Sequence, residues 1–269
     1  MIELSIVMPV YNEATTITNA IERVLAVDYP CRVELIVVDD GSTDGTARLL
    51  RGYTDRGVTV ACHPVNRGKG AAVVTGVRRA TGTHVLILDA DLEYTPKDIP
   101  ALLAPVLAGT ADHVFGTRVF GLNTRFPSFR FAMGGRATTT VANVLFDSCL
   151  TDMHTCLKLV PVAQFRHLSL AQQGFGLDTE LTAMMLRSGV RPYEVPITYN
   201  GRTLDQGKKI GWRDGWACLR ILLTVRLRKP AALPNGPFGR PELVLMPTPS
   251  HRVLHFDDEP DWEVLDAAT

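Results

Sequence analysis

The stretch HVLILDADLEY, residues 84–94, places two aspartates one residue apart directly after an apolar run. Residues 85–88 are continuously apolar, which is typical of a strand covered on both faces of a sheet. Asp89 and Asp91 follow this run, and Glu93 comes two residues later. Residues two apart in an extended segment point the same way, so three carboxylates repel one another unless a cation lies between them. The stretch therefore allows two interpretations: an acidic turn in water, or a divalent-cation site at the carboxyl edge of an α/β sheet.

Strand-like and helix-like segments alternate around this stretch. The expected strands are residues 4–10, 33–38, 58–62, 85–88 and 113–118, and the expected helices are residues 14–26, 46–53, 71–80 and 96–107. This order predicts an α/β fold with a single Rossmann-like, mostly parallel sheet and helices on both faces. A polar cluster follows each strand, so the clusters would meet at one edge of the sheet, as they do in nucleotide sites.

Composition limits the class of protein. The chain has 269 residues, 46% of them hydrophobic and 21% charged, which is typical of a soluble globular protein with one large domain. Its 28 basic and 28 acidic residues give no net charge, so nothing favours nucleic acid as a partner. The five cysteines show neither a CxxC pair nor a zinc spacing, which favours reduced thiols. Without a signal-peptide pattern or a run of about 18 apolar residues, we expect a cytoplasmic protein.

One competing motif is GKGAAV, residues 68–73, which opens an expected helix after a strand. Asp89 lies about twenty residues further on, the distance that a dinucleotide-binding fingerprint requires. However, Val73 occupies the position of the third glycine, and the acids come as a DxD pair instead of one ribose-binding residue. No GxxxxGK[ST] motif is present either. A dehydrogenase and a P-loop protein are both disfavoured.

Five motifs, taken in order, resemble the inverting family 2 glycosyltransferases. They are SIVMPVYNE (5–13), LIVVDDGSTDGT (35–46), NRGKGAAVVTG (66–76), LILDADLEYTPKDIP (86–100) and VFGTR (114–118). The chain looks most like the dolichol-phosphate mannosyltransferase and polyprenyl-phosphate glycosyltransferase branch, over residues 3 to about 228. The resemblance implies a GT-A fold and a nucleoside-diphosphate sugar donor such as GDP-mannose or UDP-hexose. We therefore expect a catalytic domain at residues 1–229 and a Pro/Gly-rich, acidic tail at residues 230–269.

The resemblance also assigns site residues. Mg²⁺ or Mn²⁺ would bind Asp89, Asp91 and Glu93, although the branch often has glutamine at the third position, and Glu93 could instead bind through water or face solvent. The catalytic residues would be Asp91, Arg118 and Asp152. The donor site would comprise Pro9, Tyr11, Glu13, Val38, Asp40, Lys69, Asp89, Ala90, Asp91, Arg118, Arg202 and Lys208. Pro9, Tyr11 and Glu13 match positions around the base and ribose, whereas Arg118, Arg202 and Lys208 match phosphate contacts. Lys69 either approaches phosphate or is merely solvated.

The segments TDMHTCLK (151–158) and GFGLDTELTAMMLRSG (174–189) resemble the acceptor side of these enzymes. Asp152 is a candidate general base, although an acceptor phosphate is already anionic and needs none. His154 stands where relatives commonly carry an acid, and it either contacts the acceptor or is simply packed. Asp178 and Glu180 begin an expected helix, so capping accounts for at least one of them.

The last expected elements follow in EVPITYNGRTLDQGKKIGWRDG, residues 194–215. Residues 195–199 read as an edge strand containing Pro196, and the cationic loop after it suits a lid over a diphosphate. The helix at 212–229 is aromatic and basic, so it either lies on an anionic membrane surface or packs on the core with snorkelling arginines. We expect a lipid phosphate acceptor. The alternatives are a small hydroxylated metabolite as acceptor, or a non-catalytic protein that binds sugar nucleotides.

Overall fold

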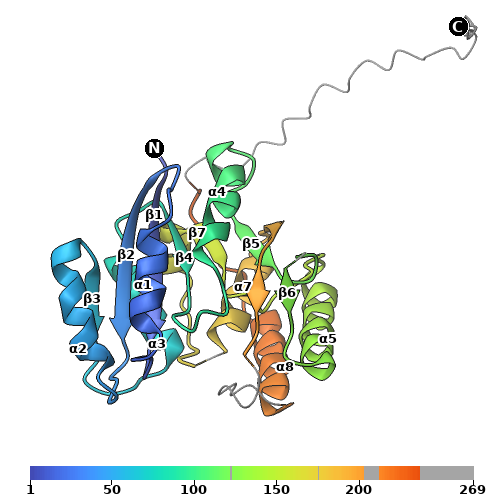
Figure 1. The fold of residues 1–269 in the computed structure, drawn as a ribbon. Coiled ribbons are helices and arrows are strands. Elements are labelled where there is room, and N and C mark those ends of the chain that lie inside the picture. Colours follow the sequence, from blue (N-terminus) through green and yellow to red (C-terminus); the bar gives the residue numbers. More distant parts are fainter. Residues whose placement is uncertain (122, 175, 203–211, 237–269) are drawn as a thin grey trace, which may run out of the picture. The chain divides into compact units, whose positions relative to one another are not determined.

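A central sheet organises the computed structural model, which describes residues 1–121, 123–174, 176–202 and 212–236 (Figure 1). Within these residues, seven strands pair in the order β3-β2-β1-β4-β7-β5-β8. They are β1 Glu3–Val10, β2 Arg32–Asp39, β3 Thr59–Cys62, β4 His84–Ile87, β5 Val114–Thr117, β7 Lys158–Pro161 and β8 Tyr193–Pro196. Of these seven, β7 alone runs antiparallel to its neighbours. The expected mostly parallel α/β sheet is confirmed.

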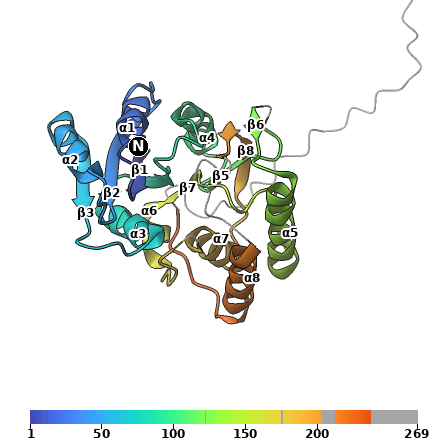
Figure 2. The same ribbon diagram turned by 60° about the horizontal axis from the view of Figure 1, so that its bottom comes forward.

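Helices cover both faces of the sheet. The α-helices are α1 Ile17–Leu25, α2 Thr46–Leu50, α3 Lys69–Arg79, α4 Ile99–Leu107, α5 Phe129–Phe146, α6 Val162–His167, α7 Leu177–Arg187 and α8 Trp212–Leu227. Short 3₁₀ helices, Arg51–Arg56 and Pro96–Asp98, extend α2 and precede α4. Figure 2 shows α1 and α4 along one face and α3 and α6 along the other. All nine elements expected before residue 119 are present, whereas α5, α6 and β7 were not predicted.

The core follows from the apolar pattern of the sequence. Every residue of β4 is buried, as is the whole of β1 from Leu4 onward. In α1, Ile17, Ile21 and Val24 recur at helical spacing and are buried against the sheet. The continuous burial of the central strands explains why their polar residues are confined to the strand ends.

The reversed strand β7 brings a distant segment to the carboxyl edge of the sheet. Its residues pair with β4 so that Val85 faces Val160 and Leu86 faces Leu159. Because β7 is antiparallel, its first residue, Lys158, lies towards the carboxyl end of β4. The segment before β7, which contains Asp152, therefore reaches the same edge as the aspartates that follow β4.

The segment after α7 differs from the expected single edge strand at 195–199. β8 is the last strand of the sheet and ends at Pro196, and the chain then forms β9, Tyr199–Asn200, which pairs with β6, Thr124–Arg125. The break has a local cause, since Asp98 accepts a hydrogen bond from the backbone N–H of Thr198 at 2.7 Å. The amide of Ile197 still donates to the carbonyl of Thr117 in β5, and the pairing stops where Asp98 takes the following amide.

After α8 the chain continues along the domain. Ala231 and Leu233 pack against the core, and Gln164 Nε2 donates to the carbonyl of Pro234 at 3.0 Å. These contacts lie beyond the boundary expected at residue 229, and that boundary stays a prediction. The rest of the expected tail lies outside the described residues. In the described part of the chain, the helices are too short or too polar to cross a membrane.

Candidate active site

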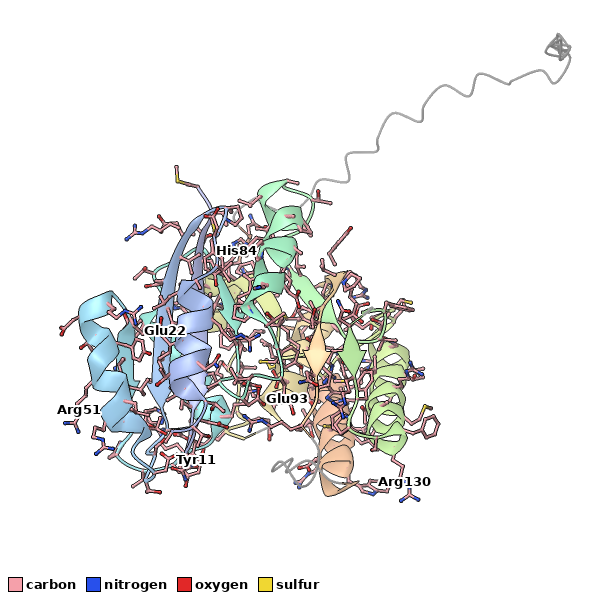
Figure 3. All side chains as sticks on the ribbon, in the orientation of Figure 1. Tyr11, Glu22, Arg51, His84, Glu93 and Arg130 are labelled. Atoms are coloured by element: carbon pink, nitrogen blue, oxygen red, sulfur yellow. The ribbon has the colours of Figure 1, made fainter. Side chains whose placement is uncertain are left out.

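The ends of β1 and β2 form one side of the candidate site. Pro9 pairs with Val38 in the parallel register, and the chain turns at Asn12, whose φ is 56°. Tyr11 is 40% exposed at this edge (Figure 3), whereas Val38 is fully buried. Glu13 accepts a hydrogen bond from Thr16 Oγ1 at 2.5 Å. Tyr11 is thus accessible to a ligand. The Val38 side chain is not accessible and can only pack beneath the residues that line the site.

Asp40 holds the loop that leads into α3. This carboxylate is 2% exposed and accepts hydrogen bonds from the backbone N–H groups of Arg67 at 3.0 Å and Gly68 at 2.7 Å. His63 Nδ1 lies 2.6 Å from the same carboxylate, and its Nε2 lies 2.9 Å from Thr75 Oγ1. Asp40 is therefore engaged within the chain, and its expected place in the donor site stays a prediction. Sequence reasoning missed His63, although it directly follows β3 as Asp40 follows β2.

Lys69, the first residue of α3, is not a solvated side chain. Its Nζ lies 2.8 Å from Asp89 Oδ2 and 3.3 Å from Asp178 Oδ2. Burial lowers the pKa of Lys69, but the charges of Asp178 and Asp89 outweigh burial and raise the pKa well above its ordinary value. The solvated alternative is wrong, because Lys69 ties the aspartate turn after β4 to the start of α7.

The start of α3 is also closed by backbone contacts. The N–H groups of Gly70 and Ala71 donate to the carbonyl of Gln173 at 2.5 and 3.2 Å. Gly68 has a φ of 94°, and a Cβ there would lie 2.5 Å from the same carbonyl oxygen. The glycines of the GKG motif thus permit a close approach of the 172–174 backbone.

The aspartate turn carries concentrated negative charge. Asp91 Oδ1 accepts the backbone N–H of Glu93 at 3.0 Å, Ala90 is buried, and Leu92 adopts a left-handed φ of 64°. Burial, followed by the charges of Asp89 and Glu93, raises the pKa of Asp91 to about 7. The interpretation as an acidic turn in water is wrong for this geometry. Partly buried carboxylate oxygens that repel one another fit a divalent cation.

The Glu93 carboxylate bonds to the segment that contains Tyr199 and Arg202. It is 9% exposed, its Oε2 accepts from the Tyr199 hydroxyl at 2.8 Å, and its Oε1 accepts from the Arg202 backbone N–H at 2.8 Å. The solvent-facing alternative for Glu93 is therefore wrong. Within the described ranges, no group of three His, Cys, Asp or Glu side chains converges as a metal site. Asp89 and Asp91 fit the expected ion, whereas the structure does not bring Glu93 to them.

Arg202 and Asp91 meet at a cavity of about 380 Å³. Arg202 Nε and Nη2 donate to the carbonyl of Asp91 at 3.0 and 2.5 Å, and Nη2 lies 3.5 Å from Glu13 Oε2. The cavity is lined by Glu13, Thr15, Thr16, Asp91, Leu92, Asn200 and Arg202. The structure thus brings three predicted site residues from distant segments together. Lys208 lies outside the described residues.

Arg118 and Asp152 form a buried pair on the other side of the aspartate turn. Arg118 Nε and Nη2 donate to the two oxygens of Asp152 at 2.6 and 2.8 Å. The guanidinium also lies 4.8 Å from the centre of the Tyr199 ring. Burial raises the pKa of Asp152, but the charge of Arg118 outweighs burial and holds the pKa below its usual range. Asp152 thus holds Arg118 here, and the catalytic roles expected of both stay predictions.

Asp178 and Glu180 are not helix caps. Neither side chain bonds to the first amides of α7; Asp178 faces Lys69 and also Lys158, whose fully buried Nζ lies 3.6 Å away. Glu180 accepts the N–H groups of Ala171 and Gln172, both at 2.8 Å. The capping interpretation is wrong because these carboxylates have stronger partners in other segments. Lys158 was missed, since nothing local to its sequence marks it as a charge partner.

His154 is held against α5. Its Nε2 lies 2.6 Å from Thr138 Oγ1, and its backbone N–H donates to Asp152 Oδ1 at 3.1 Å. Burial lowers the pKa of His154 to about 4, although the charge of Asp152 opposes the shift. This geometry agrees with the alternative in which His154 is a packed residue.

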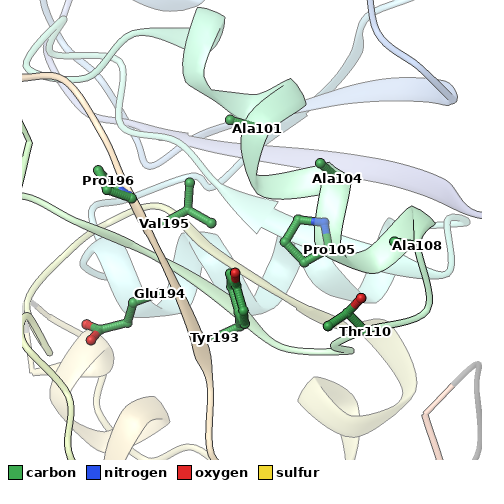
Figure 4. A pocket seen from close by; sticks show the side chains of 9 residues that line it. All are labelled: Ala101, Ala104, Pro105, Ala108, Thr110, Tyr193, Glu194, Val195 and Pro196. Carbon is green, nitrogen blue, oxygen red and sulfur yellow. The ribbon is translucent and has the colours of Figure 1, made fainter. Parts of the chain in front are cut away.

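A second cavity of about 430 Å³ lies between α4 and β8 (Figure 4). Its lining residues are Ala101, Ala104, Pro105, Ala108, Thr110, Tyr193, Glu194, Val195 and Pro196. None of the predicted site residues lines it. Although it is the larger of the two cavities, its mostly apolar wall carries no group suited to a diphosphate.

Comparisons with known proteins agree with this architecture. The family model described as Glycosyl transferase family 2 matches residues 5–156. The undecaprenyl-phosphate mannosyltransferase of Micrococcus luteus is 30% identical over 225 residues, which are 80% of this chain and 90% of that protein. The dodecaprenyl-phosphate galacturonate synthase of Rhizobium johnstonii is 39% identical over 44% of this chain and 36% of its own length. The low-salt glycan biosynthesis hexosyltransferase Agl6 of Haloferax volcanii is 28% identical over 82% of this chain and 53% of its own length.

The matched part of this chain spans about half the length of the Haloferax hexosyltransferase and about a third of the Rhizobium synthase. Among solved structures, glucosyl-3-phosphoglycerate synthase from Mycobacterium tuberculosis in complex with uridine diphosphate has a TM-score of 0.65 and 22% identity. The match covers 84% of this chain and 80% of that one. At this level of identity the likeness concerns the fold, and it confirms the expected GT-A architecture.

Proposed function

The chain belongs to glycosyltransferase family 2, and we propose that it moves a hexose from a nucleoside-diphosphate sugar to a polyprenyl phosphate, with inversion at the anomeric carbon. The observation that carries the proposal is the cavity shared by Glu13, Asp91 and Arg202. These residues come from three distant segments and meet at the carboxyl edge of the sheet, where α/β folds bind their ligands. GDP-mannose and UDP-hexoses are the donors that we propose.

The polar wall of the cavity supports a diphosphate ligand. Arg202 is the cation that the cavity offers, and its guanidinium is already held in place by the carbonyl of Asp91. A pre-positioned guanidinium binds phosphate oxygens with strong charge-assisted hydrogen bonds. Tyr11, exposed at the same edge, offers an aromatic face to the base.

Asp89 and Asp91 would hold Mg²⁺ or Mn²⁺. Their oxygens suit such hard cations. Burial, and after it the charges of Asp89 and Glu93, raise the pKa of Asp91, so a cation would stabilise its ionised form. When bound, the ion would neutralise charge on the leaving diphosphate. Lys69 holds Asp89 from below at 2.8 Å, so this aspartate is fixed before any ligand arrives.

A phosphate acceptor agrees with the state of Asp152. An acceptor phosphate oxygen attacks the anomeric carbon while the bond from that carbon to the diphosphate breaks, and the nucleoside diphosphate leaves. This oxygen is already ionised near neutral pH, so no side chain has to remove a proton. Both oxygens of Asp152 are held by Arg118 and its pKa is lowered, which makes Asp152 a poor base.

The outer face of α8 supports a lipid acceptor. Ile221, Leu222 and Val225 are buried, so one face of the helix packs on the core. Trp216 and Leu227 are exposed, and with Arg220 and Leu223 they recur at helical spacing along the opposite face. The neighbouring helix α5 also exposes large apolar side chains, Phe129 and Val144. An exposed apolar and basic stripe suits the surface of an anionic membrane, and we propose that α8 contacts one.

A donor-binding and turnover assay tests the proposed reaction. Thermal shift with GDP- and UDP-sugars and Mn²⁺ identifies the donor, because a bound ligand raises the melting temperature. The cognate donor and a short polyprenyl phosphate should then give product that is lost in EDTA. Tight donor binding with no turnover on any acceptor would instead support a non-catalytic binding protein.

Vesicle co-sedimentation tests the lipid surface. The wild type should bind vesicles of anionic phospholipid at low salt and detach as salt screens the arginines. Leu223→Glu should abolish binding, whereas Thr224→Glu, which places the same charge beside the stripe, should weaken it less. No vesicle binding, together with transfer to a soluble hydroxylated acceptor, would replace the lipid proposal with the small-metabolite alternative.

A further inference from the structure

We infer that Glu93 is a positioning residue that joins the donor cavity to the Arg118 pair, and is not a ligand of the metal ion. Its carboxylate fastens residues 199–202 against the aspartate turn. In that position, Arg202 faces the cavity and Tyr199 packs on Arg118. The inference rests on the proposed function, since it concerns groups proposed to bind the donor.

The contacts of Glu93 define a staple between two segments about a hundred residues apart. One carboxylate oxygen accepts from the Tyr199 hydroxyl and the other from the Arg202 N–H, both at 2.8 Å. The backbone carbonyl of Glu93 accepts the N–H of Asn200 at 2.9 Å. The side chain and the main chain of Glu93 therefore both bond to residues 199–202. Glu93 and Tyr199 are 9% and 1% exposed, so these bonds are shielded from water and costly to lose.

On the donor side, the staple sets the position of Arg202. The backbone of Arg202 is fixed by Glu93, and its guanidinium then reaches back to the carbonyl of Asp91. Leu92, between these two acidic residues, adopts a left-handed backbone that β-carbon sterics disfavour. Two contacts across the turn, one from each end of Arg202, hold that strained conformation in place.

On the other side, the staple sets the position of Tyr199. The Tyr199 ring lies 4.8 Å from the Arg118 guanidinium and 5.8 Å from the Phe126 ring. Arg118 in turn holds Asp152 through two hydrogen bonds. Moving Tyr199 would therefore disturb the Arg118 pair, and moving Glu93 would disturb both Tyr199 and Arg202.

Four variants separate a positioning role from metal ligation. Glu93→Ala removes both side-chain bonds, and Tyr199→Phe removes one and keeps the ring. Glu93→Gln keeps both, because its amide oxygen can accept from Arg202 and its amide NH₂ can donate to Tyr199. Tyr94→Phe is the matched control: Tyr94 is also buried and packs on Tyr199, but its hydroxyl accepts from the Cys156 N–H.

Nucleotide and metal affinities are measured separately, by calorimetry and by Mn²⁺ electron paramagnetic resonance. Glu93→Ala should weaken the affinity for the donor diphosphate about tenfold and Tyr199→Phe about threefold, consistent with lost hydrogen bonds to a charged group. Glu93→Gln and Tyr94→Phe should stay within twofold of the wild type. The double variant Glu93→Ala/Tyr199→Phe should be no worse than Glu93→Ala, because both changes break one staple. Mn²⁺ affinity without nucleotide should be unchanged in all of them.

A large loss of Mn²⁺ affinity in Glu93→Ala, with nucleotide affinity normal in Tyr199→Phe, would overturn the inference. A readout that needs no ligand keeps this result distinct from failure of the proposed function. Exchange of the Arg202 amide hydrogen should accelerate in Glu93→Ala and Tyr199→Phe, and not in Tyr94→Phe. Equal protection of that amide in all variants would also overturn the inference, even in a protein that binds no sugar nucleotide.

Discussion

Two parts of the predicted site handle charge in opposite ways. One is the edge around Asp89, Asp91 and Arg202, which we propose binds the donor and call the donor edge, and the other is the buried pair of Arg118 and Asp152. At the donor edge, the side chain of Arg202 is 27% exposed and that of Asp89 is 23% exposed. In the buried pair, the Arg118 and Asp152 side chains are 7% and 5% exposed and bond to each other. Partly exposed charged groups can still be reached by a ligand even when they have partners in the chain, whereas buried groups must be neutralised by the fold itself. Loss of a charge should therefore affect function first at the donor edge and stability first in the buried pair.

The largest effect should come from breaking the buried pair. Asp152→Ala leaves the Arg118 guanidinium without its counter-charge in a buried site, which should lower the free energy of unfolding by about 3–5 kcal/mol. Urea unfolding followed by circular dichroism measures this change. Unchanged stability would break the comparison, because it would mean that Arg118 is not held by Asp152 in solution.

The matching change at the donor edge should reduce turnover and leave stability intact. Asp91→Ala removes one of the carboxylates that repel one another, so the urea midpoint should stay the same or rise. Turnover should nevertheless fall more than about a hundredfold, if the cation supplies several kcal/mol of transition-state stabilisation. Near-normal turnover of the wild type in EDTA would contradict the metal assignment.

A pH titration tests whether burial alone decides how a charged group affects stability, even for a residue outside the predicted site. Burial lowers the pKa of His84, at the opposite edge of the sheet (Figure 3), from 6.5 to about 4. The unfolded chain therefore takes up a proton more readily than the folded one. The free energy of unfolding should be at its full value above pH 6.5 and should fall as the pH drops towards 4. His84 should account for a loss on the order of 2 kcal/mol. His84→Leu should flatten this part of a stability-against-pH curve measured in urea.

The smallest of the four effects should come from the cationic groups of the donor edge. Arg202→Ala should raise the KM for the donor about tenfold, with little change in acceptor affinity, because a charge-assisted bond to phosphate is lost. Lys208→Ala, beyond the described residues, should act in the same direction. Steady-state kinetics with each substrate varied in turn measures both. If Arg202 is only a surface residue, the donor KM and kcat of its variant will match those of the wild type.

Sequence patterns predicted the donor half because it obeys one local rule. In a parallel sheet, residues that follow the strands meet at one edge, so the segments of Glu13 and Asp91 could be expected to lie together. The resemblance to family 2 glycosyltransferases then assigned both residues to the donor site. The strands themselves were visible as continuous apolar runs. The orientation of Glu93 could not be predicted in this way, because its partners lie in a two-residue strand more than a hundred positions away.

The acceptor half depends on contacts that leave no local signal. Asp178 and Glu180 stand at a helix start, where the known preference of carboxylates suggested capping. Their actual partners, Lys69 and the amides of residues 171–172, come from other segments. Lys158 was missed because it begins its strand, whereas the rule for parallel sheets considers only residues after a strand. Long-range pairing of buried charges is set by the tertiary fold and not by the spacing of residues along the chain.

The reversed strand β7 also has an evolutionary consequence. It returns the chain to the sheet between β4 and β5, so that everything from residue 118 to residue 157 forms one excursion that leaves and re-enters at neighbouring strands. That excursion carries Asp152, His154 and α5, while the strands β1 to β4 keep their own register without it. We therefore expect the excursion to be exchangeable between relatives as a cassette, provided that its replacement keeps the groups that pack on Tyr199, because Arg118 and Phe126 belong to the excursion.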